Sequence, residues 1–328
     1  MRTGGFFIGE NLSNRINYSK SPLKYEEQAD LLVSRGLIAD KNQLIEILKK
    51  INYYRISGYL YFFRLKGRES YIEGTELRKV LEIYYFDQNL RKILFKPIEE
   101  IEIKLKAFLG YYLAHTYGAF GYLEEKYFNI DCNQTALQYF EKEKIKYNYN
   151  KYKEMKESLK YSLSHSKDSF VKHFLETYND EFPPIWIATE LLTFGEMITL
   201  FKCLKESDLT LFSDELKIPQ KVFISWIVSV NALRNICAHH GRLWKRKTGG
   251  IPMIPRGSKY MDWNNINNVD NNILYLHITI LHYLCKHYSL NIEWENEMAV
   301  LFSENASITR ADYGFSDEWK KTIIWNEK

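Results

Sequence analysis

The sequence has few of the residues that interrupt helices or cross-link a fold. It contains only seven prolines and 16 glycines among 328 residues, and these two types are the strongest breakers of helices. Its four cysteines, Cys132, Cys203, Cys237 and Cys285, are scattered and form no CxxC pair. This spacing argues against a disulfide framework and is typical of reduced thiols in a cytoplasmic protein.

Long apolar runs and a strong charge of one sign are also missing. No segment approaches the roughly 18 apolar residues that a membrane helix needs, and residues 1–20 contain no sustained apolar stretch of the kind found in signal peptides. The net charge is only +4, which is compatible with nucleic-acid binding but does not indicate it. We therefore expect a cytoplasmic protein with no membrane partner.

Aromatic residues are abundant, at 16% of the chain, and 25 of them are tyrosines. Tyrosine suits half-buried positions and also stacks on unpaired bases. Apolar residues recur at helical spacing along most of the chain, which predicts an all-α fold. We expect an N-terminal helical unit over residues 1–70 and a larger helical bundle over 71–295. An insertion at 124–180 interrupts this bundle, and a C-terminal extension covers 296–328.

The N-terminal half has clear helix boundaries. The pattern predicts helices over 23–35, ended by Gly36, and over 41–51. A further helix begins at Thr75, and we expect Pro97 to kink or restart it.

One carboxylate falls on the apolar face of the helix that follows Pro97. That face is formed by Ile98, Ile101, Leu105, Phe108 and Tyr112. Glu102 lies four residues after Ile98 and three before Leu105, so it shares the face. A buried carboxylate needs a cation, which leads to the hypothesis that Glu102 orients Arg234. The alternative is a solvent-exposed pair with Lys106, four residues further on.

The insertion is rich in lysine, tyrosine and asparagine, and it includes Lys144, Lys146 and Lys151. Two interpretations stay open. It is either a solvated excursion or a surface that follows RNA phosphates and offers rings to unpaired bases.

A helix over 219–240, opened by Pro219, carries two different stripes. The first is apolar: Val222, Trp226, Val230, Leu233 and Cys237. The second consists of small and polar residues on one face: Ser225, Ser229, Ala232, Asn235 and His239. Small side chains allow another helix to approach closely, either within the fold or across a dimer.

The end of this helix, RNICAHHGRLWKR, combines an arginine, an asparagine and two histidines. A guanidinium offers a planar fork for phosphate oxygens, and an imidazole exchanges protons near neutral pH. The reaction that needs only such groups is attack of an RNA 2′-hydroxyl on the adjacent phosphate, with no cofactor. The plain alternative is a buried polar cluster that locks the helix end.

The motif R-N-x-x-x-H, formed by Arg234, Asn235 and His239, resembles that of the HEPN superfamily of ribonucleases. Four further segments resemble the bacterial Abi-like (AbiD/AbiF abortive-infection) family: RGL at 35–37, INYYRISGY at 51–59, IEEIEIKL at 98–105 and PPIWIATELLTFGEM at 183–197. The resemblance covers roughly residues 21–244. It implies phage defence, a HEPN-type helical bundle and RNA as the substrate. Position 241 is glycine, where toxin-type HEPN motifs often carry tyrosine.

These observations predict a metal-independent endoribonuclease. Arg234 would stabilise the phosphorane, and His239 would act as base or acid, assisted by Asn235 and by Glu102. A second proton-transfer group is needed, either His240 or a motif from a partner chain, and we expect a homodimer with a composite site. The expected RNA contacts are Tyr53, Tyr54, Arg55, Tyr59, Arg64, Lys144, Lys146, Lys151 and Arg242. For the aromatic members, a core beneath the N-terminal helices is the alternative.

The sequence also raises two rival functions, a zinc site and RNA binding without cleavage. A zinc site would draw on Cys237, His239 and His240, or on His277, His282, Cys285 and His287, but the spacing matches no known ligand pattern and no metal is expected. The other rival is a HEPN protein that binds a structured small RNA as a ribonucleoprotein without cleaving it. Retention of both arginine and histidine favours catalysis.

Overall fold

The computed structural model describes residues 17, 19–129, 151–266, 270, 272–316, 319 and 322–326. Within these ranges the chain is almost entirely helical, and pairing between extended residues is limited to isolated bridges such as Ile38 with Glu76. The predicted all-α class is confirmed.

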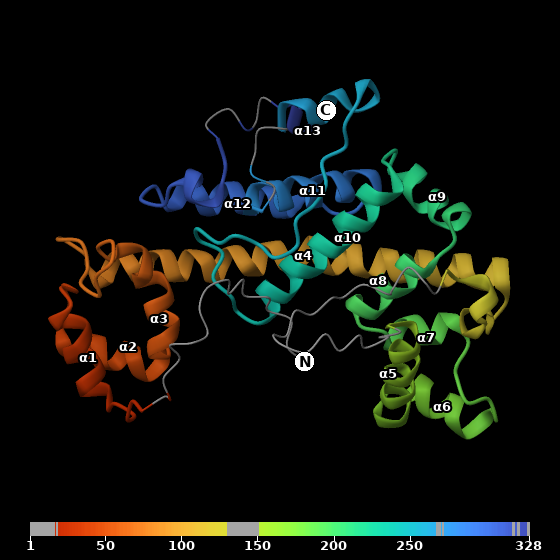
Figure 1. Ribbon diagram of the computed structural model, residues 1–328, viewed down its shortest axis with the longest axis horizontal. Coiled ribbons are helices and arrows are strands. Elements are labelled where there is room, and N and C mark those ends of the chain that lie inside the picture. The colour runs from red at the N-terminus through yellow and green to blue at the C-terminus, as the bar shows by residue number, and fades with distance from the viewer. Residues whose placement is uncertain are drawn as a thin grey trace.

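A single long helix, α4 (Leu77–Tyr117), forms the axis of the molecule (Figure 1). Its 41 residues correspond to about 60 Å at 1.5 Å per residue. The prediction of a restart at Pro97 was wrong, because α4 continues through this residue as one element. Pro97, Ile98 and Ile101 are all buried, and this packing outweighs the roughly 3 kcal/mol that an interior proline costs a helix.

The N-terminal unit lies at one end of α4. It contains α1 (Tyr25–Ser34), α2 (Lys41–Lys50) and α3 (Tyr53–Leu60), followed by the 3₁₀ turn η2 (Tyr61–Phe63). Side chains cap two of these helices, since Asp40 accepts from the Gln43 amide and Asn52 accepts from the Tyr54 amide, each at 2.8 Å. Gly36 has φ +98°, which confirms the predicted glycine stop after α1.

A second group of helices lies at the other end of α4. It comprises η3 (Gly121–Leu123), η4 (Glu125–Tyr127), α5 (Lys151–His165), α6 (Ser169–Thr177), α7 (Ile185–Leu191), α8 (Phe194–Cys203) and α9 (Glu206–Glu215). Helix α5 packs against α7 and α8, so this part of the insertion is integrated into the fold. Lys144 and Lys146 lie outside the described residues, and Lys151 is described only by its backbone at the start of α5.

The motif helix α10 (Gln220–Ala238) crosses α4, while α11 (Leu274–His287) and α12 (Glu293–Glu304) cover another side of it. The short elements η6 (Ser258–Ile266), η7 (Arg310–Tyr313) and α13 (Ile323–Asn326) complete the C-terminal part. The boundary expected at residue 295 falls inside α12, which packs along α4.

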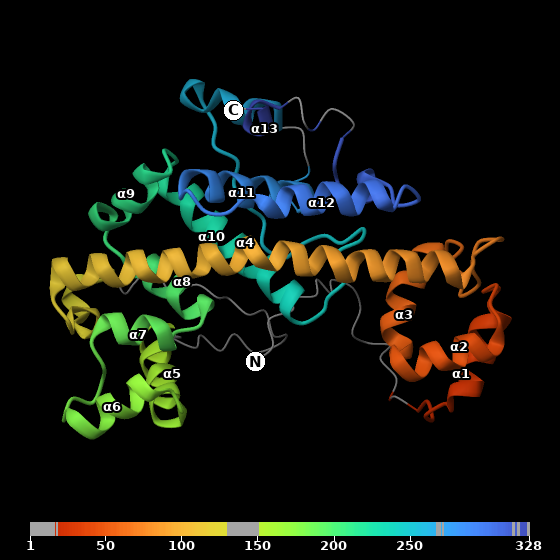
Figure 2. The same ribbon diagram turned by 180° about the vertical axis from the view of Figure 1, so that it is seen from behind.

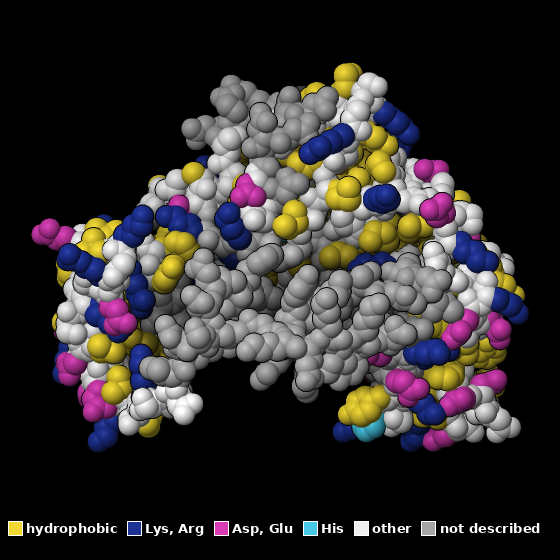
Figure 3. All heavy atoms as spheres, in the orientation of Figure 1, with side chains coloured by type: hydrophobic (Ala, Val, Ile, Leu, Met, Phe, Trp, Pro, Cys, Tyr) yellow, Lys and Arg dark blue, Asp and Glu magenta, His cyan; other side chains and the backbone are white. Residues whose placement is uncertain are grey.

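Helices α1 to α3 and helices α5 to α7 lie on the same side of α4, one set at each end, whereas α9 lies on the opposite side (Figures 1 and 2). The C-terminal end of α10, which carries the motif, emerges between them on that side. Charges of both signs are interspersed over the described surface in Figure 3, in keeping with the small net charge. Among the described residues, no helix has both the length and the apolar character needed to cross a membrane.

The small-residue stripe of α10 is covered by the chain itself. An added Cβ on Gly250 would lie 2.9 Å from the Ala232 Cβ and 3.2 Å from the Ser229 Cα. Further along, the Met253 amide donates to the Ser225 hydroxyl at 2.9 Å. Of the two partners that the sequence left open, one within the fold and one across a dimer, the structure shows the first at these three positions, where the segment around 250–253 and not a second helix occupies the space.

This packing makes Gly250→Ala a strongly destabilising change. The new methyl group meets α10 below ordinary contact distance, and overpacking of this kind costs about 1–3 kcal/mol. Gly249→Ala is the matched control, since its Cβ would meet nothing within 4 Å, and it should change stability by less than about 0.5 kcal/mol. Urea unfolding of both variants measures the difference, and equal midpoints would contradict the close packing.

Candidate active site

The motif helix α10 ends in a hydrogen-bonded C-terminal cap that fixes the backbone of both histidines. His239 is the C-cap of α10. The His240 amide donates to the Cys237 carbonyl at 3.1 Å, and the Gly241 amide donates to the Ile236 carbonyl at 2.7 Å. This pair of bonds is the Schellman arrangement, which satisfies carbonyls that the helix end would otherwise leave open.

His240 occupies the position of this stop that normally belongs to glycine. Its φ is +55°, in the left-handed region that costs a residue with a Cβ about 1–2 kcal/mol. Gly241, the next residue, is crowded as well, because an added Cβ would lie 3.1 Å from the Ile236 carbonyl oxygen. Any side chain at position 241 would therefore require its neighbours to shift by a few tenths of an ångström.

A buried carboxylate holds the segment that follows the stop. Asp87 of α4 is fully buried and accepts from the Leu243 amide at 2.7 Å and the Trp244 amide at 3.1 Å. It also accepts from the hydroxyls of Tyr59 and Tyr313, each at 2.8 Å. Asp87 thus joins the N-terminal unit, the motif segment and the C-terminal extension.

The protonation states fit these roles. Burial raises the pKa of the Asp87 carboxyl, while the hydrogen bonds from Trp244, Tyr313, Leu243 and Tyr59 oppose that rise. Burial, reinforced by the Asp87 charge, raises the pKa of the Tyr59 and Tyr313 phenols, so both remain donors at neutral pH. Four bonds to a charged acceptor, at about 1.5–3 kcal/mol each, are comparable with the several kcal/mol that burying a carboxylate costs.

Two arginines hold the carbonyl groups of the same segment. Arg91 donates to the Gly241 carbonyl at 2.9 Å and lies 3.9 Å from Asp87 Oδ2. Arg55 of α3 donates to the His240 carbonyl at 2.5 Å. The backbone around His240 is therefore fixed from α3 and from α4 at once.

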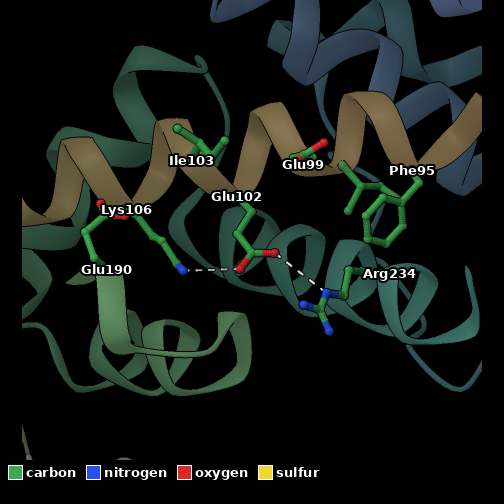
Figure 4. Close-up of a pocket in the computed structure, with 8 residues that line it drawn as sticks. Phe95, Glu99, Glu102, Ile103, Lys106, Glu190 and Arg234 are labelled. Atoms are coloured by element: carbon green, nitrogen blue, oxygen red, sulfur yellow. Dashed lines mark ion pairs between the residues drawn. The ribbon is translucent and has the colours of Figure 1, made fainter. Parts of the chain in front are cut away.

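Arg234 faces a pocket of about 220 Å³ beside α4 (Figure 4). Its Nε lies 3.7 Å from Glu102 Oε2, and Lys106 Nζ lies 3.4 Å from Glu102 Oε1. Glu102 therefore lies between both of the cations that the sequence offered as partners, and its pair with Lys106 is not solvent-exposed, since the two side chains are 15% and 14% exposed. Phe95, Ile98, Glu99, Ile103 and Glu190 complete the lining of the pocket.

The ion pair occupies only one edge of the Arg234 guanidinium. Glu102 meets the Nε edge, whereas Nη1 points toward Asn235 Oδ1 at 3.5 Å, at the limit of a hydrogen bond. The Arg234 side chain is 35% exposed, against 15% for Glu102. Asn235 is half-buried, and both His239 and His240 are exposed. A phosphate would thus meet the guanidinium from the Asn235 side, away from the glutamates.

The predicted RNA-contact residues divide by exposure. Tyr54 and Arg55 are exposed, while Tyr53 is half-buried and its hydroxyl accepts from Arg35 at 3.0 Å. Tyr59 is only 2% exposed and its hydroxyl is bound to Asp87. The expectation that Tyr59 stacks on RNA is wrong for this conformation, because its ring belongs to the core.

The two predicted basic contacts near this unit lie over aromatic rings. The Arg64 guanidinium is 5.8 Å from the centre of the Tyr61 ring, and that of Arg242 is 4.3 Å from the centre of the Phe62 ring. Both side chains are half-buried. Arg242 also donates to the Trp244 carbonyl, which ties it to the motif segment.

The residues considered as zinc ligands have other surroundings. Burial raises the pKa of the Cys237 thiol to about 12, so it stays protonated. His277 is buried against the Thr248 hydroxyl and the Gly250 carbonyl, and burial lowers its pKa. His282 contacts Glu295 and the Ile324 carbonyl. In the described part of the chain, no cluster of three histidine, cysteine or acidic side chains has the geometry of a metal site.

Comparison with known proteins adds the family to this geometry. The model of the Abi-like protein family matches residues 46–245, more than half of the chain. The chain belongs to the Abi-like family. Searches of curated proteins and of solved structures found no match. Membership of the Abi-like family indicates a role in abortive-infection defence, and the matched region contains Asp87, the Glu102–Arg234 pair and both histidines.

Sequence reasoning missed the residues that hold the motif segment: Asp87, Arg91 and Tyr313. A signal for Asp87 was present, since it lies four residues after Ile83 and three before Leu90 on the buried face of α4. Arg91 follows it by four residues, which is the spacing of an ion pair on a helix.

The left-handed backbone of His240 leads to a stability prediction. His240→Gly should raise the free energy of unfolding by roughly 0.5–1 kcal/mol, because relief of the Cβ clash exceeds the added flexibility of the unfolded chain. His240→Ala removes the same imidazole but keeps a Cβ, and it should give no such gain. Thermal unfolding of the two variants tests this, and equal or lower stability of His240→Gly would show that the imidazole itself stabilises the stop.

Proposed function

We propose that the protein is an endoribonuclease of the HEPN type that acts in abortive-infection defence and cleaves RNA without a metal ion. The observation that carries this proposal is the arrangement at the end of α10. There, Glu102 contacts the inner edge of Arg234, whose outer nitrogens lie beside Asn235, and two exposed imidazoles follow within six residues. These are the groups that transesterification of RNA requires.

In the proposed reaction, the 2′-oxygen of one nucleotide attacks the adjacent phosphorus. The bond between phosphorus and the 5′-oxygen breaks, which leaves a 2′,3′-cyclic phosphate and a 5′-hydroxyl. A base takes the proton of the 2′-hydroxyl, and an acid gives a proton to the departing 5′-oxygen. Arg234 stabilises the charge on the phosphorane through its outer nitrogens.

Glu102 is a positioning residue in this scheme. Because the aliphatic arm of arginine is flexible, the guanidinium needs a fixed partner to present one edge to phosphate. Glu102 supplies it from α4, and Lys106 shares the charge of that carboxylate at 3.4 Å. Glu99 and Glu190 line the same pocket, so an anion is repelled from the inner side of Arg234.

His239 serves as base or acid, and the second group is either His240 or a histidine of a partner chain. The stripe at Ser225, Ser229 and Ala232 no longer supports a dimer, since the chain covers it. Asn235 and His239 remain accessible at the end of the helix. We propose that the site is completed by a second chain in a homodimer, because one imidazole rarely performs both proton transfers in a single displacement.

The acidic lining of the pocket favours a second candidate function. Arg234 pairs with Glu102 in a pocket that also contains Glu99 and Glu190, and this ion pair would stabilise the bundle even without catalysis. The protein would then bind a structured RNA without cleaving it. Cleavage assays separate the two functions.

The first catalytic prediction concerns Arg234 and His239. In EDTA, wild type should cleave unstructured RNA, and Arg234→Ala and His239→Ala should each lose at least about a hundredfold in rate, the usual scale of a lost electrostatic or acid–base contribution. His173→Ala, at an exposed position on α6, is the control for a general effect of removing an imidazole. Cleavage that needs added divalent metal, or that survives both changes, would refute the proposal.

His240→Ala and mixed dimers then locate the second group. If His239→Ala is inactive and His240→Ala keeps nearly full cleavage activity, the partner chain supplies the second proton-transfer group. In that case, dimers that combine an Arg234→Ala chain with a wild-type chain should show less than the average of the two parent activities. Loss of activity in His240→Ala places both groups in one chain.

The second catalytic prediction separates the two cations around Glu102. Glu102→Gln keeps the shape of the side chain but removes its charge, so cleavage should fall about tenfold or more through loss of Arg234 orientation. Lys106→Gln is the matched control, since it removes the other ion pair of the same carboxylate and should leave the rate within about twofold. Full activity of Glu102→Gln, with unchanged thermal stability, would contradict the positioning role.

A further inference from the structure

Two tyrosine rings stand out from one face of α3. Tyr54 is 73% exposed and Tyr61, the C-cap of this helix, is 63% exposed. They are seven residues apart, which places them on the same face and about 10 Å apart along the helix axis. Rings this exposed contribute little to the core, in contrast to Tyr59 of the same helix.

The space between the two rings is open. Gly58 lies between them on this face, and a Cβ added there would meet no atom within 4 Å. Bases in a stacked strand are about 3.4 Å apart, so the distance between the rings corresponds to a few nucleotides. Two exposed rings with open space at the glycine between them are suited to bases that are not paired.

The charge of this segment complements a nucleic-acid backbone. Between residues 52 and 68 the chain carries Arg55, Arg64, Lys66 and Arg68 and no acidic residue. The next acidic residue along the chain, Glu69, is paired with Arg35. Arg55 and Lys66 are exposed, and the Arg64 guanidinium lies over the Tyr61 ring at 5.8 Å. Phosphates and bases could therefore both be contacted along α3 and the turn that follows it.

This face borders the side of α3 that contacts the candidate active site. Arg55 follows Tyr54 directly, and its guanidinium donates to the carbonyl of His240. In both ribbon views α3 is the helix of its unit nearest the middle of the molecule, on the side where α10 ends (Figures 1 and 2). A strand bound on the tyrosine face would thus lie about a quarter turn of α3 away from the side that contacts the segment of His240.

We propose that the face formed by Tyr54, Gly58 and Tyr61 is a stacking platform for unpaired bases, which makes single-stranded RNA the substrate class. This inference rests on the proposed function. The platform binds nucleotides next to the cleaved phosphate, Arg55 and Arg64 contact their phosphates, and a duplex is excluded because its bases are already stacked and paired.

The test measures binding in a His239→Ala background, so that the RNA remains intact. The probe is an unstructured oligoribonucleotide of mixed sequence, compared with the same strand in a duplex. Tyr54→Ser and Tyr61→Ser should each weaken single-strand binding on the order of tenfold, while Tyr54→Phe and Tyr61→Phe keep the ring and should bind as the parent does. The parent should bind the duplex more weakly than the single strand.

Three further variants separate stacking from charge and from misfolding. Gly58→Leu places a side chain between the rings without removing either, and it should weaken binding, whereas Gly58→Ala should bind as the parent does. Tyr54→Ser should leave the salt dependence of affinity unchanged. Arg64→Gln should reduce the slope of log affinity against log salt concentration by about one, because it removes one phosphate contact. On RNA with abasic residues across the bound region, the serine variants should lose nothing further.

The outcomes also separate this inference from the proposed function. If the His239→Ala parent binds RNA but the serine and Gly58→Leu variants bind equally well, the platform is refuted and the ribonuclease proposal stands. If wild type neither cleaves nor binds any RNA, the proposed function fails. If the variants leave RNA affinity unchanged but dissociate a dimer in sedimentation, this face is a contact between subunits and the inference is overturned.

Discussion

The fully buried Asp87 carboxylate is the constraint on which the candidate site depends. It accepts from two backbone amides of the segment after α10 and from tyrosines of the N-terminal unit and of the C-terminal extension. These three parts of the chain are far apart in sequence, and each supplies donors to one anion. Removing any donor leaves a buried charge less compensated, so the carboxylate favours the single arrangement in which all of them meet.

That arrangement determines where the motif can act. The segment from His240 to Trp244 is held by Asp87, Arg91 and Arg55, so the helix stops at a fixed point with both histidines exposed. One turn earlier, Arg234 is held at its inner edge by Glu102 of the same long helix α4. Helix α4 therefore carries both anchors, Asp87 for the backbone and Glu102 for the guanidinium. The proposed chemistry relies on this common support.

Periodicity and turn chemistry were enough to predict the helical class, the glycine stop after α1 and the closeness of Glu102 to Arg234. They failed where tertiary packing overrides a local rule. Pro97 was expected to kink or restart a helix, but α4 continues through this residue as one element, with Pro97 and its neighbour Ile98 buried. The small residues of α10 left open whether another helix approaches within the fold or across a dimer, and the structure shows that the non-helical segment at Gly250 fills this space. Likewise, the short helix α3 carries both Tyr54 and Tyr59, and only the fold shows that Tyr54 is exposed and Tyr59 is buried.

The most direct test of this account is amide hydrogen exchange of Leu243 and Trp244 in wild type and in Asp87→Asn, measured alongside RNA cleavage. Asparagine matches the size of aspartate but cannot accept from all four donors. The account predicts that both amides lose protection, that global unfolding remains cooperative and that the cleavage rate falls with the loss of protection. Unchanged exchange at Leu243 and Trp244, or full cleavage despite their loss of protection, would contradict the claim that Asp87 holds the active-site segment in place.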